Sequence, residues 1–289
     1  MRDIGCEVGH SRPKAEEYPD DLLLFHQDPD VALGQQAAAR GSGVDMIGNH
    51  FIAGLEVEDR DALLRVASRV SLTVGQILIE QGDEVRIVHL PTTAHLANIT
   101  HNPDGERLQT AVVGSEGMTG LAPFLANAPC AWQVVCAVAG EAMAVPADRL
   151  RHLSDQRPAL RRRLLTLTHF YQAQANQLAL CNTLHSVDQR LARWILTLAD
   201  RSVGAPLSAT QGRIAADLGV QRTSVASAFQ KARAAGLISL GRSRIEILDW
   251  PSLMARSCGC YGQMRRLECD LGVIVSDPLP AGRAAKASA

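Results

Sequence analysis

The apolar positions between residues 70 and 145 occur in short runs that are separated by turn residues. The stretch Asn102-Pro103-Asp104-Gly105 between two of the runs is typical of a hairpin turn. Many short strands at close spacing are typical of a sandwich, barrel or jelly roll. The pattern therefore predicts a β-roll or jelly roll with strands at Val70–Val74, Gln76–Ile79, Val85–Leu90, His95–Thr100, Leu108–Val113, Gln133–Val138 and Glu141–Val145.

Other segments have different patterns. Residues 1–46 lack sustained periodicity and contain several prolines and a Gly41-Ser42-Gly43 stretch, so we predict a mostly disordered extension. A short helix is expected between Asp59 and Arg69, and Val187–Asp200 carries an apolar stripe typical of a longer one.

A heptad pattern follows Pro158, a residue that suits the first turn of a helix. Spacings of four and three alternate along Leu160, Leu164, Leu167, Tyr171, Gln174, Leu178 and Cys181. A helix buried against its own domain would be similar, but the strict alternation and the adjacent arginines favour a coiled coil between two chains. A helix over Pro158–Cys181 is therefore predicted to dimerise, with Gln174 fixing its register, through Leu160, Leu164, Leu167, Tyr171 and Leu178.

Ala215, Gly219 and Val225 have the spacing of a helix-turn-helix. A small residue lets two helices approach, glycine permits a positive φ at the turn, and an apolar residue packs the second helix onto the first. Ser208-Ala209-Thr210-Gln211 fits a capping box with Ser208 as the N-cap of the first helix. The second helix is predicted to run from near residue 221 to Gly236.

The start of that second helix carries hydrogen-bonding side chains, as base-edge readout requires. Arg222 suits guanine because its parallel donors match O6 and N7. Leu237–Leu240 and Arg244–Leu248 predict the two strands of a wing, whose arginines would contact phosphates. The candidate DNA-binding residues are Thr210, Gln211, Gln221, Arg222, Thr223, Ser224, Ser227, Arg242 and Arg244.

Charge is divided unequally along the 289 residues. Residues 1–150 hold 10 basic and 21 acidic residues, a net charge of −11, whereas residues 151–289 hold 19 and 9, a net charge of +10. An acidic half joined to a basic half indicates that only the C-terminal half faces a polyanion.

No apolar run is as long as a membrane-spanning segment, and the first 18 residues lack the apolar core of a secretory signal, so we expect a cytoplasmic protein.

Seven scattered cysteines argue against a disulfide framework. Cys181 and His185 lie four residues apart on one helix face, and Cys258 and Cys260 could join them if the C-terminal tail folds back. The simpler interpretation is that the three thiols are buried, or have no chemical role. These four residues are therefore candidate metal ligands only, and no cofactor is expected. We do expect Cys181, Cys258 and Cys260 to lie close in space, with Tyr261 packed at the base of the winged domain.

The chain resembles the Crp/Fnr family of bacterial transcription regulators over roughly residues 49 to 265. The resemblance is carried by Cys181–Val187, Arg190–Trp194, Leu218–Val225, Gly236–Ile238, Cys258–Tyr261 and Val113–Gly120. It implies a homodimer that binds a near-palindromic operator in double-stranded DNA, with RNA polymerase as a further partner. We expect an α+β fold divided into an extension (1–46), a cyclic-nucleotide-binding-like β-roll (47–150), a dimerisation helix and linker (151–185), a winged helix-turn-helix (186–250) and a tail (251–289).

Within this resemblance, binding of cyclic AMP requires a glutamate after the first glycine of the cassette and an arginine further on. Met118 takes the glutamate position, and the arginine position falls near Cys130 or Ala131. A buried phosphate without a cation is unfavourable, and Glu116 precedes the glutamate position that Met118 takes. We therefore predict no cyclic AMP binding of the usual kind. Leu121, Phe124, Leu125 and Trp132 form an apolar wall that could hold an uncharged ligand, and we interpret it as core.

Other chemistries receive less support. The chain contains no P-loop, His-Glu-x-x-His or Gly-x-Ser-x-Gly motif, so an enzyme is not expected. Iron–sulfur members of the family use an N-terminal cysteine cluster, whereas this chain has only Cys6 there. His89, His95 and His101 could be imagined as haem ligands, but strand and loop histidines are more often surface residues. A redox or metal sensor that uses Cys181, Cys258 and Cys260 remains the alternative function.

Overall fold

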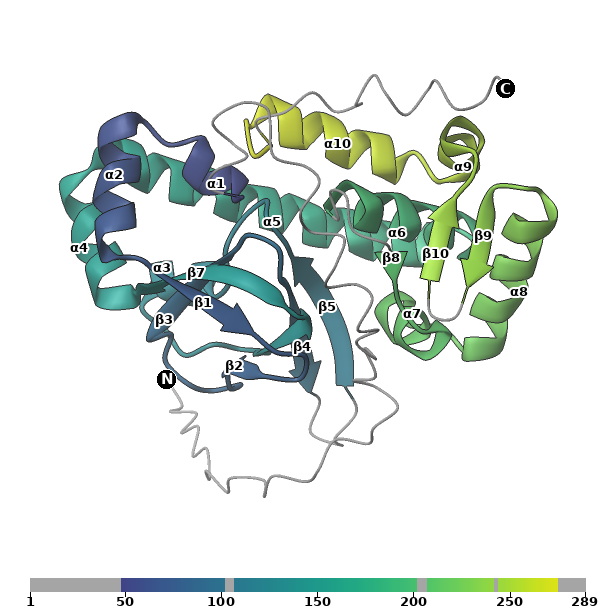
Figure 1. Ribbon diagram of the computed structural model, residues 1–289, viewed down its shortest axis with the longest axis horizontal. Coiled ribbons are helices and arrows are strands. Elements are labelled where there is room, and N and C mark those ends of the chain that lie inside the picture. The colour runs from purple at the N-terminus through teal and green to yellow at the C-terminus, as the bar shows by residue number, and fades with distance from the viewer. Residues whose placement is uncertain (1–47, 102–106, 202–206, 242–243, 275–289) are drawn as a thin grey trace, which may run out of the picture.

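The computed structural model describes residues 48–101, 107–201, 207–241 and 244–274. A β-roll lies on the left of Figure 1 and a winged-helix domain on the right, and α5 extends between them. The helices are α1 (His50–Ala53), α2 (Val57–Val66), α3 (Leu121–Ala126), α4 (Ala147–Gln156), α5 (Pro158–Leu184), α6 (Val187–Arg201), α7 (Gln211–Leu218), α8 (Arg222–Ala234), α9 (Trp250–Arg256) and α10 (Cys260–Asp270). The strands are β1 (Ser68–Leu72), β2 (Ile77–Ile79), β3 (Ile87–Pro91), β4 (His95–His101), β5 (Arg107–Val113), β6 (Gln133–Val138), β7 (Gly140–Pro146), β8 (Leu207–Ser208), β9 (Ile238–Gly241) and β10 (Arg244–Ile247).

The β-roll consists of two antiparallel sheets with strand orders β1-β7-β3 and β2-β6-β4-β5. Leu72 of β1, Leu96 of β4 and Val134 of β6 belong to one buried cluster, so the two sheets pack face to face. All seven strands predicted from the apolar runs are present, with ends that shift by at most two residues. The α+β class and the predicted order of β-roll, long helix and winged helix are confirmed.

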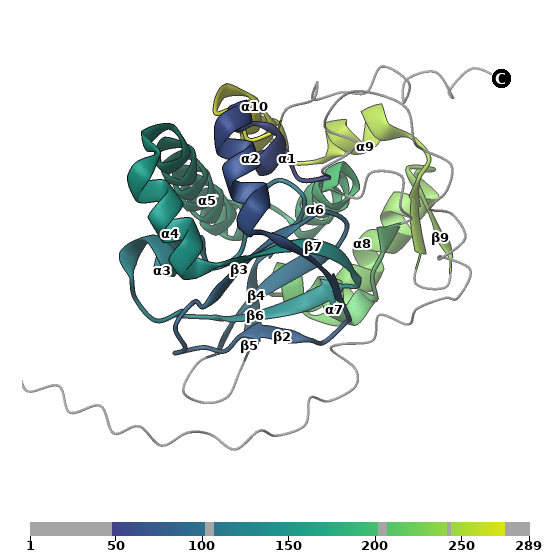
Figure 2. The same ribbon diagram turned by 60° about the vertical axis from the view of Figure 1, so that its left-hand side comes forward.

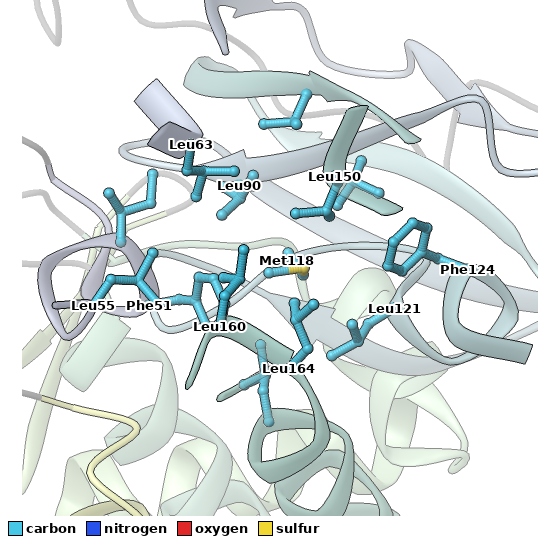
Figure 3. Packing of buried hydrophobic residues seen from close by; sticks show 14 of the residues in the cluster. Phe51, Leu55, Leu63, Leu90, Met118, Leu121, Phe124, Leu150, Leu160 and Leu164 are labelled. Carbon is cyan, nitrogen blue, oxygen red and sulfur yellow. The ribbon is translucent and has the colours of Figure 1, made fainter. Parts of the chain in front are cut away.

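Helix α5 covers the β-roll with the face that carries the four-three repeat. Leu160, Leu164 and Leu167 are at most 2% exposed within this single chain and pack with residues of β3, α3 and α4. Figure 3 shows Leu160 and Leu164 among Leu90, Leu121 and Leu150 of these elements. Side chains that one chain already buries cannot also form the surface between two chains. The predicted seam is therefore wrong for these leucines: the repeat reflects packing of α5 against its own domain.

The winged-helix domain has a separate core around α6. Leu191 and Ile195 of α6 pack against Ile214 of α7 and Phe229 of α8, and the three-stranded sheet β8-β10-β9 closes the domain. The N-cap of α7 is Thr210, whose hydroxyl oxygen accepts a hydrogen bond from the backbone N–H of Arg213 at 3.2 Å. The capping box predicted from Ser208 is thus corrected, because that residue belongs to β8.

The C-terminal segment turns back beside α5, as both ribbon views show (Figures 1 and 2). The guanidinium of Arg163 donates hydrogen bonds to the carbonyl oxygens of Leu271 and Gly272 at 3.2 and 2.9 Å. Val273 is buried in the cluster that lies between α5 and the β-roll. The predicted return of the tail to the base of the winged domain is confirmed by Tyr261, which lies in that domain's core.

Some predictions fall outside the described residues. They concern the extension 1–46, the turn Asn102-Pro103-Asp104-Gly105, the wing tip with Arg242, and the chain after residue 274. None of the helices in the described ranges is both long and apolar enough to span a bilayer.

Candidate nucleic-acid interface

The turn between α7 and α8 has the geometry that the sequence predicted. Gly219 adopts a left-handed conformation with φ of 60°, which a residue with a side chain rarely takes. Ala215 and Val225 are buried on either side of this turn. The buried guanidinium of Arg190, on α6, donates a hydrogen bond to the carbonyl oxygen of Leu218 and so holds the end of α7 in place.

Helix α8 presents its first turn to solvent. Gln221, Arg222, Thr223 and Ser227 are exposed, whereas Ser224 is half-buried. The opposite face carries the buried Val225, Ala228 and Phe229, which fix the helix to the domain. In Figure 1 α8 lies at the right-hand edge of the molecule, on the side away from the β-roll. This surface is therefore free to enter a groove.

The flanking candidates border the same end of the domain. Arg244 is exposed at the start of β10, where it pairs with Gly241 of β9. Thr210 and Gln211, at the start of α7, are half-buried, and Thr210 is engaged in capping. The wing and the starts of α7 and α8 thus carry the predicted residues, apart from Arg242, which is not described.

Two arginines connect the winged-helix domain to the β-roll. Arg201, in the last turn of α6, donates to the carbonyl oxygen of Val112 at 2.9 Å, and its Nε lies 3.5 Å from Oε1 of Glu116. Arg213 of α7 donates to the side chain of Gln109 in β5 and pairs with Asp217 at 2.7 Å. Burial raises the pKa of Asp217, although Arg213 opposes this shift. Sequence reasoning did not find these contacts, because single arginines on helices give no signal of an interdomain role.

The cassette between β5 and α3 is already occupied by a side chain of α5. The Tyr171 hydroxyl accepts a hydrogen bond from the backbone N–H of Met118 at 3.2 Å. It also lies directly against Gly117, where an added Cβ would come within 2.0 Å of the hydroxyl oxygen. Met118 itself is buried in the core, as is Cys130. Leu121 and Phe124 of the predicted apolar wall are core residues as well.

A cavity of about 390 Å³ lies where the β-roll, α5, α6 and α10 meet. Trp132, Tyr171, Leu178 and Trp194 are among the residues that line it. Four arginines also line it: Arg193, Arg201, Arg213 and Arg265. Three of them are ion-paired with carboxylates, Arg201 with Glu116, Arg213 with Asp217, and Arg265 with Asp200 and Glu268.

The predicted approach of the cysteines is confirmed. Cys181 near the end of α5 lies 3.5 Å from Cys258, measured between the Sγ atoms, and Cys260 Sγ lies 3.5 Å from Nδ1 of His185. The three cysteines are at most 3% exposed, and His185 is half-buried. Burial, together with the neighbouring Cys181 thiol, raises the pKa of Cys258.

The outward face of α5 remains uncovered in the single chain. Leu165, Leu180 and Leu184 are 52%, 45% and 69% exposed. His169 and Gln172, also exposed, belong to this face, which is opposite the residues that pack on the β-roll.

Comparisons with known proteins agree with these two domains. Residues 69–157 match the cyclic nucleotide-binding domain family, and residues 189–256 match the Crp-like helix-turn-helix domain family. The transcriptional activator protein anr of Pseudomonas aeruginosa is 30% identical over 220 residues, which cover 71% of this chain and 87% of that protein. The transcriptional activator protein FnrA of Stutzerimonas stutzeri is 27% identical over the same shares of the two chains.

Solved structures share the fold at lower identity. FixK2 from Bradyrhizobium japonicum superimposes with a TM-score of 0.59 and 16% identity, covering 67% of this chain and 98% of that one. The c-di-GMP-responsive global regulator CLP of Xanthomonas campestris gives a TM-score of 0.56 and 14% identity over 67% of this chain and all of that one.

Proposed function

This chain belongs to the Crp/Fnr family of transcription regulators, and from this premise we propose that a homodimer of it reads a near-palindromic operator with two copies of α8. The observation that carries the proposal is the solvent-exposed first turn of α8, held by the Gly219 turn and the Arg190 contact. Members of this family bind DNA as dimers, and a two-fold protein requires two half-sites related by the same symmetry.

The side chains have separate roles in this proposal. Arg222, with Gln221, Thr223, Ser224 and Ser227 around it, contacts base edges in the major groove. Arg244, at the wing, contacts the phosphate backbone, which gives affinity without sequence information. Arg242 is assigned to phosphate as well, and Thr210 and Gln211 to the backbone beside the groove. The net charge of +10 over residues 151–289 supports this placement of the DNA.

The two chains associate through the outward face of α5 rather than through the leucines that the repeat had indicated. Leu165, Leu180 and Leu184 expose apolar surface there, and burying such surface favours association. The face extends along the whole helix, so two antiparallel or parallel copies could make a continuous contact. Tyr171 and Leu178 belong to the face turned toward the β-roll and have no place in this interface.

The β-roll responds to a signal other than cyclic AMP, or acts without a ligand. Tyr171 takes the space at the cassette and the hydrogen bond of Met118, while Met118 and Cys130 stand where the usual anchors would be. We place the protein's action in the cytoplasm and its output at RNA polymerase, as for a regulator that binds promoter DNA.

Selection of bound sequences from random DNA tests the proposal. Purified full-length protein is expected to enrich one motif with two-fold symmetry and half-sites about one helical turn apart. Enrichment without sequence preference would contradict base readout, and a single half-site without its mate would contradict the dimer.

A further inference from the structure

We propose that Cys181, His185, Cys258 and Cys260 bind one zinc ion, which fastens the turn between α9 and α10 to the end of α5. The four ligand atoms all lie within 4.8 Å of one another, although they come from segments more than 70 residues apart. The site is separate from the base-reading helix, so it does not depend on the function proposed above.

The distances fit one tetrahedral ion. With Zn–S bonds of about 2.3 Å and a Zn–N bond of about 2.0–2.1 Å, a tetrahedron has edges of about 3.8 Å between sulfurs and about 3.6 Å between sulfur and nitrogen. The Cys181–Cys258 and Cys260–His185 separations are both 3.5 Å. Movements of about 1 Å at the widest pair would complete the geometry.

The backbone presents the ligands in two pairs. Cys181 lies in the last turn of α5 and His185 is the C-cap of that helix, so both ligands stand at the same end of α5. Cys258 and Cys260 lie on either side of Gly259, where the chain turns from α9 into α10. Gln177, one turn before Cys181, donates its amide N–H to Cys260 Sγ at 3.0 Å, an interaction that stabilises a thiolate and orients it.

The ligand set selects zinc and a structural role. Three thiolates and one imidazole around a single point favour Zn²⁺ over magnesium or calcium, which prefer oxygen. Four protein ligands leave no open position, as in sites that stabilise a fold. An iron–sulfur cluster would distribute its cysteines over several irons, whereas these four atoms converge on one point.

The charge change is balanced by a neighbouring cation. When the three Zn–S bonds form, three thiol protons leave for solvent and the neutral imidazole adds the fourth bond, so the centre carries one net negative charge. The buried guanidinium of Arg190 lies near enough to interact electrostatically with Cys181 and Cys258. Its Nε has no hydrogen-bond partner among the residues that the structure describes.

This arrangement gives the ion a position at the joint between the two domains. Only His185 and Ser186 separate α5 from α6, and His185 is itself a ligand. Arg190 then connects the site with the carbonyl oxygen of Leu218, next to the helix-turn-helix turn. Bound zinc therefore fixes the α9–α10 turn against the end of α5 and stiffens the base of the winged domain.

Metal content of the full-length protein tests the site directly. Protein purified without chelator is expected to contain about one zinc per chain, and the variant Cys258→Ser/Cys260→Ser close to none. Cys269→Ser is the matched control, because this cysteine is exposed on α10 and lies outside the cluster. Equal zinc in the wild type and the double variant, or a Cys181–Cys258 disulfide in freshly purified protein, would overturn the proposal.

If a serine variant fails to fold, cobalt spectroscopy tests the coordination geometry in the wild-type protein instead. Co²⁺ added to metal-free wild-type protein is expected to give intense visible bands and thiolate-to-cobalt charge-transfer bands of tetrahedral coordination. His185→Cys should retain these bands with added sulfur character, His185→Ala should lose most of them, and Gln177→Ala should weaken affinity by about 10–100-fold. Six-coordinate cobalt with weak bands in the wild type would contradict the site.

Thermal unfolding measures the structural role. Removal of zinc by a chelator should lower the Tm of the wild type and of Cys269→Ser by about 5 °C or more, and leave that of the double variant unchanged. An identical Tm of the wild type with and without chelator would contradict a structural role for zinc.

Discussion

Nε of Arg201 lies 3.5 Å from Oε1 of Glu116, and this ion pair joins the winged-helix domain to the β-roll. The two side chains are 10% and 2% exposed. Glu116 also accepts a hydrogen bond from the backbone N–H of Gly114 at 2.9 Å. Each charge therefore depends on the other, because an unpaired charge is unfavourable in a buried site.

Removal of one partner should be costly. Glu116→Ala leaves the Arg201 guanidinium buried without its carboxylate, and we expect the free energy of unfolding to fall by about 3–5 kcal/mol in urea denaturation. Asp155→Ala is the control: it breaks the exposed Arg161–Asp155 pair and should change stability by less than about 1 kcal/mol. A Glu116→Ala protein as stable as the wild type would show that the pair does not connect the domains.

Acid stability should depend on His89. Burial lowers its pKa from 6.5 to about 4, so the folded protein keeps this imidazole neutral when the unfolded chain takes up a proton. Stability is therefore lost as the pH falls from about 6.5 to about 4, by up to about 1.4 kcal/mol per pH unit.

Comparison with His89→Leu isolates this contribution. The buried His95, whose pKa is also lowered, and the carboxylates are present in both proteins and largely cancel in the difference. The decline in unfolding free energy should be shallower in the variant, whereas the exposed His152→Ala should match the wild type. Equal slopes for the wild type and His89→Leu would refute the assignment.

Cyclic nucleotides should not bind in the usual way. Calorimetry with cyclic AMP and cyclic GMP is expected to show no saturable heat at micromolar concentrations, because the Tyr171 hydroxyl lies against Gly117 and the phosphate would find no unpaired arginine in the cassette. Micromolar binding of either nucleotide would disprove this interpretation of the β-roll.

The outward face of α5 should govern association. Leu165→Asp places a charge in the proposed interface and should shift sedimentation from dimer to monomer, with secondary structure retained because the leucine is 52% exposed in one chain. Val57→Asp, at a residue of α2 with 59% exposure, is the control and should stay dimeric. A Leu165→Asp dimer as tight as the wild type would show that the interface is not on the outward face of α5.

Periodicity predicted elements well and their partners less well. The seven strands and the helix-turn-helix followed from local patterns. Short apolar runs between turn residues indicate strands, and the left-handed turn between α7 and α8 favours glycine at position 219. The repeat on α5 correctly showed that one face is buried. It could not show what buries that face, since a coiled coil and a β-roll both select apolar residues at Leu160 and Leu164.

Long-range contacts were predictable only where the chemistry was unusual. The Cys258-x-Cys260 pair with Cys181 suggested convergence, and the structure confirmed it. The Glu116–Arg201 pair was missed, because one glutamate and one arginine 85 positions apart are ordinary residues until the fold buries them.

The N-cap of α7 was predicted two residues too early. Serine and threonine are both good N-caps, and Ser208 is excluded from that role because it belongs to strand β8.

The central claim is that α8 reads bases while the wing holds the backbone, and binding to the selected operator tests it through two arginine variants. Arg222→Ala should lose about 1–3 kcal/mol on that operator and relax the preference at one base pair per half-site. Arg244→Ala should weaken binding to all sequences alike and reduce the salt slope of binding by about one unit per subunit. Equal losses of sequence preference in the two variants, or an unchanged operator preference in Arg222→Ala, would contradict the account.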